Sequence, residues 1–245
     1  MKWGYQLIYG STLSFQVIHA LKERGIVVEI EKVNGLFLYR RKGGFPEDYV
    51  EKVTNVSREE GFVIHPVHSI QPEVSTSLLL RLSKPLMVAP GSTVTIYVKA
   101  PINVGVYVVE KDAHRLIDSF NPTPYKYALY GPTSNGIICR FYRTDIFSKP
   151  PYTEFWEAVA KITIENEAEN FAEVKNVVYP LLNADVYVDN DGMAYVEAAR
   201  LQIFRDNAGV VYLENEPPLA GLIKCPEQFG GLQERVAKFI MEFGL

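Results

Sequence analysis

The sequence predicts an all-β, mainly antiparallel protein with a β-sandwich-like architecture, built as one large sandwich or two packed sandwich units, with an α-helix at its C-terminal end. Three observations predict this fold. β-Branched and aromatic residues recur in short runs that are typical of strands. The breaks between these runs carry Asn, Asp, Gly and Pro in turn-forming combinations. Apolar residues take their clearest helical spacing near the end of the chain.

The clearest hairpin comes first. The runs from Ile26 to Lys32 and from Leu36 to Arg41 flank Asn34-Gly35. Asn-Gly readily adopts the positive φ angles that a type I′ turn requires. The sequence therefore predicts two antiparallel strands at this point.

Further hairpins are predicted later in the chain. Residues 185–188 and 194–199 flank Asp189-Asn190-Asp191-Gly192, and residues 201–205 and 210–214 flank Asp206-Asn207-Ala208-Gly209. The turn Ser134-Asn135-Gly136 precedes another predicted strand. Each break has the composition of a tight connection between paired strands.

The segment from Leu86 to Val109 indicates strands with one buried face. Polar and apolar residues alternate from Thr93 to Lys99, which places the apolar set inward. Pro101 separates this run from a second one, Val104 to Val109. We expect two strands here.

Two segments carry helical patterns. Leu232, Val236, Phe239, Ile240 and Phe243 follow Gly230-Gly231 at the spacing of an amphipathic helix. Ser11 to Gly25 fits either a helix ended by Gly25 or an alternating strand, so both alternatives stay open there.

Charge is distributed unevenly along the 245 residues. Residues 1–150 hold 18 Lys/Arg and 13 Asp/Glu, a net +5, whereas residues 151–245 hold 7 and 16, a net −9. The change of sign falls at Pro150-Pro151, which predicts a basic β-rich unit (1–150) and an acidic one with the C-terminal helix (151–245). A single two-layer domain is the alternative.

Composition also limits the environment and the partners. Cys139 and Cys225 are far apart and lack a CxxC context, so we expect free thiols in a reducing cytoplasm. No apolar stretch approaches the ~18 residues of a membrane span. The diffuse basic charge makes nucleic acid an unexpected partner. The opposed charges of the two halves are compatible with a homo-oligomer.

Several motifs resemble those of a largely archaeal family catalogued as domain of unknown function number 432. They are Lys84-Pro85-Leu86 through Tyr97, Ile102-Asn103-Val104-Gly105-Val106, Lys126 through Gly131, and Asn135 through Tyr142. The resemblance covers mostly residues 60–200. It implies an archaeal cytoplasmic source and a β-rich fold, and it carries no catalytic residue.

The densest candidate site lies between Pro124 and Arg143, where tyrosines and cations flank a predicted turn. On a strand starting at Ile137, Arg140 and Tyr142 share a face. A hairpin that placed cations and phenols on one surface would suit a polar or anionic ligand, or a partner protein. The candidate ligand- or partner-binding residues are Lys126, Tyr127, Tyr130, Arg140, Tyr142 and Arg143.

Three other groups of residues give weaker evidence for a functional site. His65 and His68 are metal-ligand types, but residues three apart on a strand point to opposite faces, so we expect no metal and no cofactor. Asp112, His114, Asp118 and Ser119 contain the residue types of nucleophilic catalysis without a GxSxG turn. We interpret them as a polar loop capping a turn of helix. Gly43-Gly44 after Arg40-Arg41-Lys42 is interpreted as the exit of a hairpin.

These features predict a non-catalytic protein that binds a partner protein or a small polar ligand through its Tyr/Arg/Lys face. One alternative is a hydrolase of a sugar or phosphorylated compound, with carboxylates brought together from both halves. Another is a structural subunit of a homo-oligomer.

Overall fold

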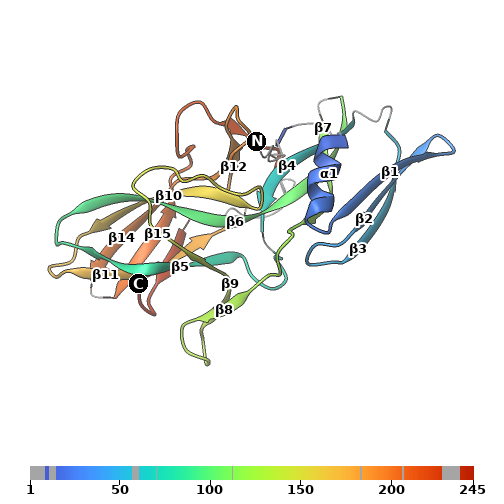
Figure 1. The fold of residues 1–245 in the computed structure, drawn as a ribbon. Helices are drawn as coiled ribbons and strands as arrows, with labels where there is room; N and C mark the ends of the chain where they lie inside the picture. The colour runs from blue at the N-terminus through green and yellow to red at the C-terminus, as the bar shows by residue number, and fades with distance from the viewer. Residues whose placement is uncertain are drawn as a thin grey trace.

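Strands make up most of the chain in the computed structural model, as the recurring β-branched and aromatic runs predict (Figure 1). The structure describes residues 9–10, 15–56, 61–69, 71–111, 113–182, 184–205, 207–227 and 238–245. The N-terminal elements are α1 (Phe15–Glu23), β1 (Val27–Val33), β2 (Leu36–Lys42), β3 (Tyr49–Thr54), β4 (Phe62–His68), β5 (Ser77–Val88), β6 (Thr93–Glu110), β7 (Ala113–Phe120), β8 (Tyr127–Tyr130) and β9 (Ile137–Thr144). They are followed by β10 (Glu157–Asn166), β11 (Ala172–Pro180), β12 (Val186–Val188), β13 (Ala194–Val196), β14 (Ala199–Arg205), β15 (Ala208–Leu213), β16 (Ile223–Lys224) and β17 (Lys238–Met241).

The N-terminal region is a three-stranded sheet in the order β1-β2-β3, with α1 against β1. The predicted hairpin is confirmed, since Asn34 and Gly35 have φ values of 52° and 81° between β1 and β2. The segment before Gly25, for which the sequence leaves helix and strand as alternatives, is a helix from Phe15 onward. Residues 11–14 lie outside the described residues. Gly25 has a φ of 77°, the left-handed conformation that commonly ends a helix.

Strand β6 is a single long strand where the sequence predicts two. Its first half, Thr93–Pro101, pairs antiparallel with β10, and its second half pairs with β4 and β7. Pro101 sits where the partners change, and Ile102 donates its amide to the carbonyl of Trp156 at 3.0 Å. Proline lacks an N–H, so a position between two ladders tolerates it without ending the strand.

The largest sheet has mixed strand directions. Strand β10 pairs antiparallel with β6 on one edge and parallel with β13 and then β14 on the other. The register against β10 shifts by one residue between the pairs Val159–Tyr195 and Ile162–Ala199. The strand is therefore interrupted at Glu197 and Ala198, between β13 and β14. The hairpins β12–β13 and β14–β15 are confirmed.

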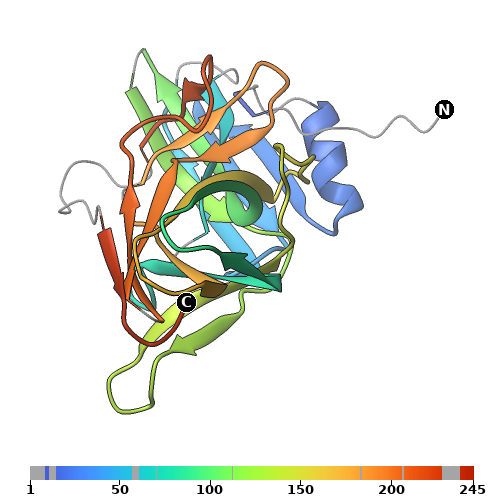
Figure 2. The same ribbon diagram turned by 90° about the vertical axis from the view of Figure 1, so that its left-hand side faces the viewer.

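A four-stranded sheet in the order β11-β5-β9-β8 faces part of this large sheet. Strands β5 and β9 are parallel, so this sheet is mixed as well. Figure 2 shows the strands curling around a common interior, in the manner of half a barrel. The apolar side chains inside form one large buried cluster that reaches from Tyr9 to Leu245. A regular two-layer sandwich remains a prediction.

The predicted C-terminal helix is wrong over Lys238–Met241, which forms strand β17 and pairs antiparallel with β15. Met241 is buried and Phe239 half-buried, while Lys238 and Ile240 are exposed, so the burial alternates with the period of a strand. The unpaired edge of β15 supplies backbone hydrogen-bond partners that a helix cannot use. The part of the predicted helix before Lys238, which begins at Leu232, lies outside the described residues.

Residues on both sides of Pro150 pair within the same sheets, β6 with β10 and β5 with β11. This pairing favours the single-domain alternative, and the division at Pro150 stays a prediction. In the described part of the chain, the short helix α1 falls well below the length and apolarity needed to cross a membrane.

Candidate functional site

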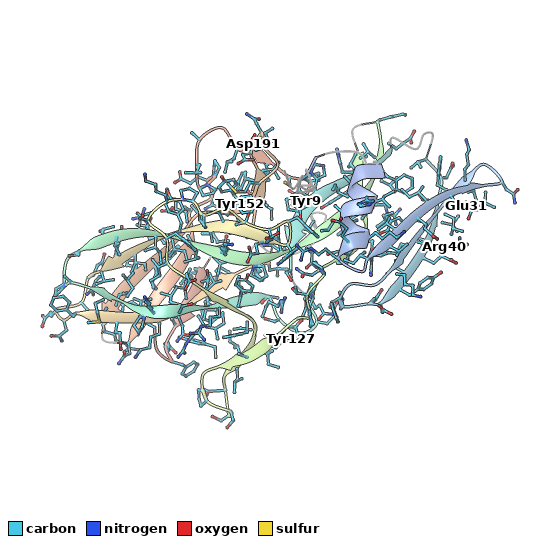
Figure 3. All side chains as sticks on the ribbon, in the orientation of Figure 1. Tyr9, Glu31, Arg40, Tyr127, Tyr152 and Asp191 are labelled. Atoms are coloured by element: carbon cyan, nitrogen blue, oxygen red, sulfur yellow. The ribbon has the colours of Figure 1, made fainter. Side chains whose placement is uncertain are left out.

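The predicted site lies on the hairpin of β8 and β9 at the lower edge of the molecule, where Tyr127 is labelled (Figure 3). The two strands pair antiparallel with Tyr127 directly opposite Arg140. Directly opposed residues point to the same face of a sheet, and residues two apart on a strand share that face. Tyr127 and Arg140 therefore lie side by side, with Tyr142 farther along the same face of β9.

Arg140 is buried, with 3% of its surface exposed. Its Nε donates to Ser69 Oγ at 3.4 Å and its Nη1 donates to the Lys126 carbonyl at 3.1 Å. Its guanidinium carbon stacks 4.2 Å from the centre of the Tyr125 ring. Burial lowers the pKa of Arg140, although the surrounding tyrosines oppose the effect.

This guanidinium has no carboxylate partner among the described residues. A guanidinium carries five N–H donors, and the two hydrogen bonds above leave Nη2 without an acceptor in the described part of the chain. A buried charge is costly unless it is paired, and the stacked ring offsets only part of this cost. The arrangement suits a bound anion.

Neutral polar groups surround Arg140. Asn103 Nδ2 donates to the hydroxyls of Ser119 and Tyr125, and Tyr127 donates its hydroxyl to Gln71 Oε1 at 2.6 Å. Asn103 Oδ1 is buried and accepts no hydrogen bond from the described residues. Burial raises the pKa of Tyr125, which keeps its hydroxyl protonated. A ligand that offers both an anionic oxygen and a hydroxyl would match these groups.

The other predicted site residues do not join this cluster. Tyr130 lies on the opposite face of the hairpin, where it packs against Phe239 and Phe243 and donates its hydroxyl to the Gly244 carbonyl at 2.9 Å. Lys126 and Arg143 have exposed side chains, and Arg143 has the opposite strand parity to Arg140. The structure therefore does not bring these three side chains together with the Arg140 guanidinium, and their role in binding stays a prediction.

Tyr142 shares the face of Arg140 but belongs to a separate polar pair. Its hydroxyl donates to Glu157 Oε1, and Glu157 Oε2 accepts from Lys99 Nζ at 3.0 Å. Burial, followed by the hydrogen bond to Glu157, raises the pKa of Tyr142. These contacts join β9 to β6 and β10.

Sequence reasoning missed Ser69, Gln71 and Asn103, which come from distant segments. Asn103 could have been recognised as part of a polar cluster, because it is an amide within the buried run from Ala100 to Tyr107. A buried polar side chain in such a run needs hydrogen-bond partners and so points to a polar cluster.

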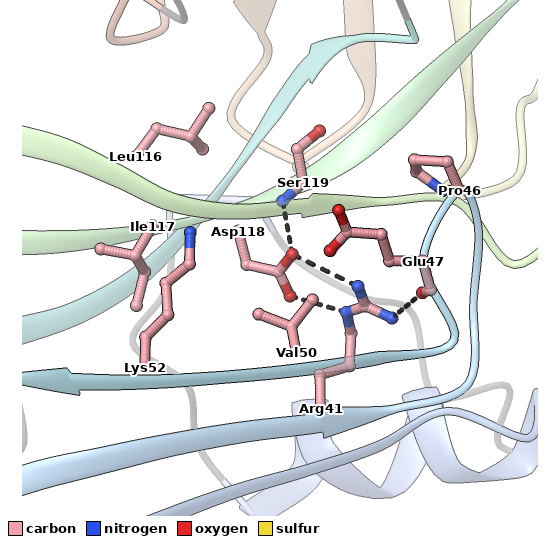
Figure 4. Close-up of a pocket in the computed structure, with 9 residues that line it drawn as sticks. All are labelled: Arg41, Pro46, Glu47, Val50, Lys52, Leu116, Ile117, Asp118 and Ser119. Atoms are coloured by element: carbon pink, nitrogen blue, oxygen red, sulfur yellow. Dashed lines mark hydrogen bonds and ion pairs between the residues drawn. The ribbon is translucent and has the colours of Figure 1, made fainter. Parts of the chain in front are cut away.

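A second polar cluster lies between β2 and β7, beside a cavity of about 260 Å³ (Figure 4). Arg41 is fully buried and its Nε donates to Asp118 Oδ2 at 2.6 Å, with Nη2 at 3.3 Å from Oδ1. The same carboxylate accepts from the Tyr39 hydroxyl at 2.8 Å and the Ser119 amide at 2.9 Å. Arg41 Nη1 donates to the carbonyls of Gly43 and Glu47.

This arrangement corrects the interpretation of Asp118 and Ser119 as a polar loop beside a helix, because both lie within strand β7. The physical reason is pairing with β6, which supplies a ladder along nearly all of β7. Asp112 lies outside the described residues. Both oxygens of Asp118 accept hydrogen bonds from Arg41, so the pair joins the two sheets and is poorly suited to proton transfer.

His65 and His68 lie on β4 and point to opposite faces, as their spacing predicts. His65 packs edge-on against Tyr107 and His114, with ring centres 5.7 and 5.9 Å apart. His68 Nε2 lies 2.8 Å from the Ala184 carbonyl. Burial lowers the pKa of each to about 4. In the described part of the chain, no three His, Cys, Asp or Glu side chains lie together in a group that could hold a metal ion.

These features define a class: a β-rich protein of mixed, curled sheets, with two polar clusters centred on buried arginines. The chain belongs to the family described as "Protein of unknown function (DUF432)", whose model matches residues 8–242. Comparisons with curated proteins and with solved structures gave no match.

Proposed function

We propose that this protein is a non-catalytic binding protein that holds a small polar anion at Arg140. The observation that carries the proposal is a buried guanidinium whose Nη2 donates to no described residue and which has no carboxylate partner there. A carboxylate or phosphate oxygen would supply the missing counter-charge. Arginine recognises both groups through paired N–H donors.

Selectivity would come from the neutral groups around the guanidinium. Asn103 Oδ1 is an acceptor without a donor, so it favours an anion that also carries a hydroxyl or amide N–H. The Tyr125 and Tyr127 rings add apolar surface with fixed hydroxyl tips, and their ring centres lie 6.5 Å apart. We infer a ligand of hydroxy-acid or phosphorylated polyol type.

Thermal unfolding with sulfate, phosphate and citrate, against chloride at equal ionic strength, tests this proposal. A ligand at one hundred times its Kd stabilises the folded state by about 2.7 kcal/mol, which raises the Tm of a chain of this size by roughly 5–10 °C. Arg140→Gln should remove the increase. Arg143→Gln is the matched control, because this exposed arginine lies on the same strand and faces away.

A second variant covers the case in which Arg140→Gln fails to fold. Asn103→Asp is isosteric and adds a carboxylate to the cluster, so it should weaken anion binding while the fold is kept. The proposal is wrong if none of the three anions raises the Tm above the chloride control, or if the increase persists in both Arg140→Gln and Asn103→Asp.

The hydrolase alternative receives less support. It needs two carboxylates in one concave site, and Glu47 and Asp118 do line the same cavity. Both oxygens of Asp118, however, already accept hydrogen bonds from Arg41, Tyr39 and Ser119, so neither is free to contact a substrate.

A further inference from the structure

A groove runs between β3 and β7, where the three-stranded sheet meets the large sheet. Two cavities of about 260 and 320 Å³ share Lys52, Leu116 and Ile117 in their linings, so they form one continuous depression. One end is closed by backbone hydrogen bonds between Phe45 and Asn121, at 2.9 and 3.0 Å.

Both walls of the groove are edge strands. Among the described residues, β3 pairs with β2 alone and β7 with β6 alone. Consecutive residues line each wall, 52–54 on β3 and 115–119 on β7. Successive side chains of a strand point to opposite faces, so a lining of consecutive residues means that the strand edge itself borders the groove. Unpaired backbone N–H and C=O groups on such an edge can bind an extended chain.

Strand β7 also departs from a regular ladder at the groove. The pairing with β6 shifts between Val106–Asp118 and Tyr107–Leu116, which makes Ile117 the extra residue of a β-bulge. The bulge turns Asp118 inward to Arg41 and leaves Leu116 and Ile117 half-buried in the groove wall. Bulges on edge strands commonly re-aim side chains next to binding sites.

The charges in the groove favour an acidic occupant. The charges of Arg41 and Asp118 compensate each other in the closed part of the groove. Lys52 and Arg115 line the second cavity, both are exposed, and neither forms an ion pair with a described residue. Glu47 is the remaining lining carboxylate, and it lies with Arg41 in the first cavity.

We propose that this groove binds an extended, acidic segment of a partner protein, which adds as a strand to the edge of β3 or β7. Its carboxylates meet Lys52 and Arg115, and its apolar side chains contact Leu116 and Ile117. The groove shares Ser119 with the polar groups around Arg140, but it does not depend on the function proposed for that cluster.

A displayed library of random eight-residue segments tests this inference when it is selected on the full-length protein. The selected segments should be rich in Asp and Glu and poor in Pro. Their affinity should fall by about tenfold or more on Lys52→Glu/Arg115→Glu, because charge reversal replaces attraction by repulsion. The control is Lys84→Glu/Arg143→Glu, which reverses two exposed cations on β5 and β9 that form no ion pair with a described residue.

Backbone pairing is tested on the best selected segment. N-methylation of alternate residues should abolish its binding in one register and spare it in the other, because only every second residue of an added strand donates to the edge. Binding should also slow amide hydrogen exchange in β3 or β7. The inference is overturned if no segment is selected, if the selected segments are not acidic, if charge reversal in the groove has no more effect than in the control, or if both methylated registers bind equally. Self-association of the protein through the groove without a segment would overturn it as well.

Discussion

The buried ion pair of Arg41 and Asp118 can be tested through the sign of the stability changes that its substitutions cause. Arg41→Met leaves the Asp118 carboxylate buried, with Tyr39 and Ser119 as its remaining donors. Loss of one partner of a buried ion pair costs about 3–5 kcal/mol, because the other charge is left uncompensated. We expect Arg41→Met to lower the free energy of unfolding by this amount.

Asp118→Asn should have opposite effects on stability in the wild-type protein and in Arg41→Met. In the wild-type protein, Asp118→Asn leaves the Arg41 guanidinium without its counter-charge and destabilises the fold by roughly 2–5 kcal/mol. In Arg41→Met, the same change removes the stranded charge and keeps an acceptor for Tyr39, so it should restore about 1–3 kcal/mol.

Urea unfolding of the wild type, both single variants and the double variant measures this coupling. Arg40→Met is the control, because Arg40 lies on the same strand with exposed partners Glu31 and Glu51, and its loss should change stability little. If Asp118→Asn destabilises both backgrounds equally, the pair is not energetically coupled and the reasoning is refuted.

Three further predictions concern other parts of the fold. Gly43→Ala should destabilise the protein by roughly 1–3 kcal/mol or more in thermal unfolding. Gly43 has a φ of 85°, and an added Cβ would lie 2.3 Å from the Gly25 carbonyl oxygen. Gly91→Ala is the control and should cost less, because Gly91 also has a positive φ but has open space around it. Glu197→Ala should cost about 2–4 kcal/mol, since its buried carboxylate accepts from the amides of Asp185 and Asn215 at 2.9 and 2.8 Å, and Glu197→Gln, which keeps an acceptor, should recover part of the loss. Stability should fall as the pH falls from 6.5 towards 4, because burial lowers the pKa of His68 to about 4 and the unfolded chain binds the proton first. His68 accounts for roughly 3 kcal/mol of this loss. His65, whose pKa burial also lowers to about 4, adds to it. His68→Gln should therefore reduce the slope of the pH profile of urea unfolding without removing it, whereas an unchanged slope would show that His68 does not titrate on unfolding.

Local signals predicted the elements that depend on neighbouring residues. Asn34-Gly35 specifies a turn that joins strands adjacent in sequence, and Thr93 to Lys99 shows on its own which face is buried. The C-terminal error has a physical origin, since Phe239, Ile240 and Phe243 fit a helical spacing while Phe239 and Met241 also fit a strand. Pairing with the edge of β15 stabilises the strand conformation of this segment over the helical one.

The candidate sites depend on contacts between distant segments, and these carried little local signal. Arg140 meets Ser69 across 71 residues, and Arg41 meets Asp118 across 77. A hairpin pattern places Arg140 next to Tyr127 but does not show which side chains cover the guanidinium. The sequence therefore predicted an exposed cationic face where the structure has a buried charge.

The uninterrupted course of β6 has a thermodynamic consequence for both proposed sites. This one strand carries Asn103 of the Arg140 cluster and supplies the ladder that holds β7 in place beside the groove. Any rotation of one region against the other would have to twist a backbone that is paired with β10 in its first half and with β4 and β7 in its second. Ligands at either site therefore meet a preorganised frame, and little of their binding free energy is spent on ordering the protein.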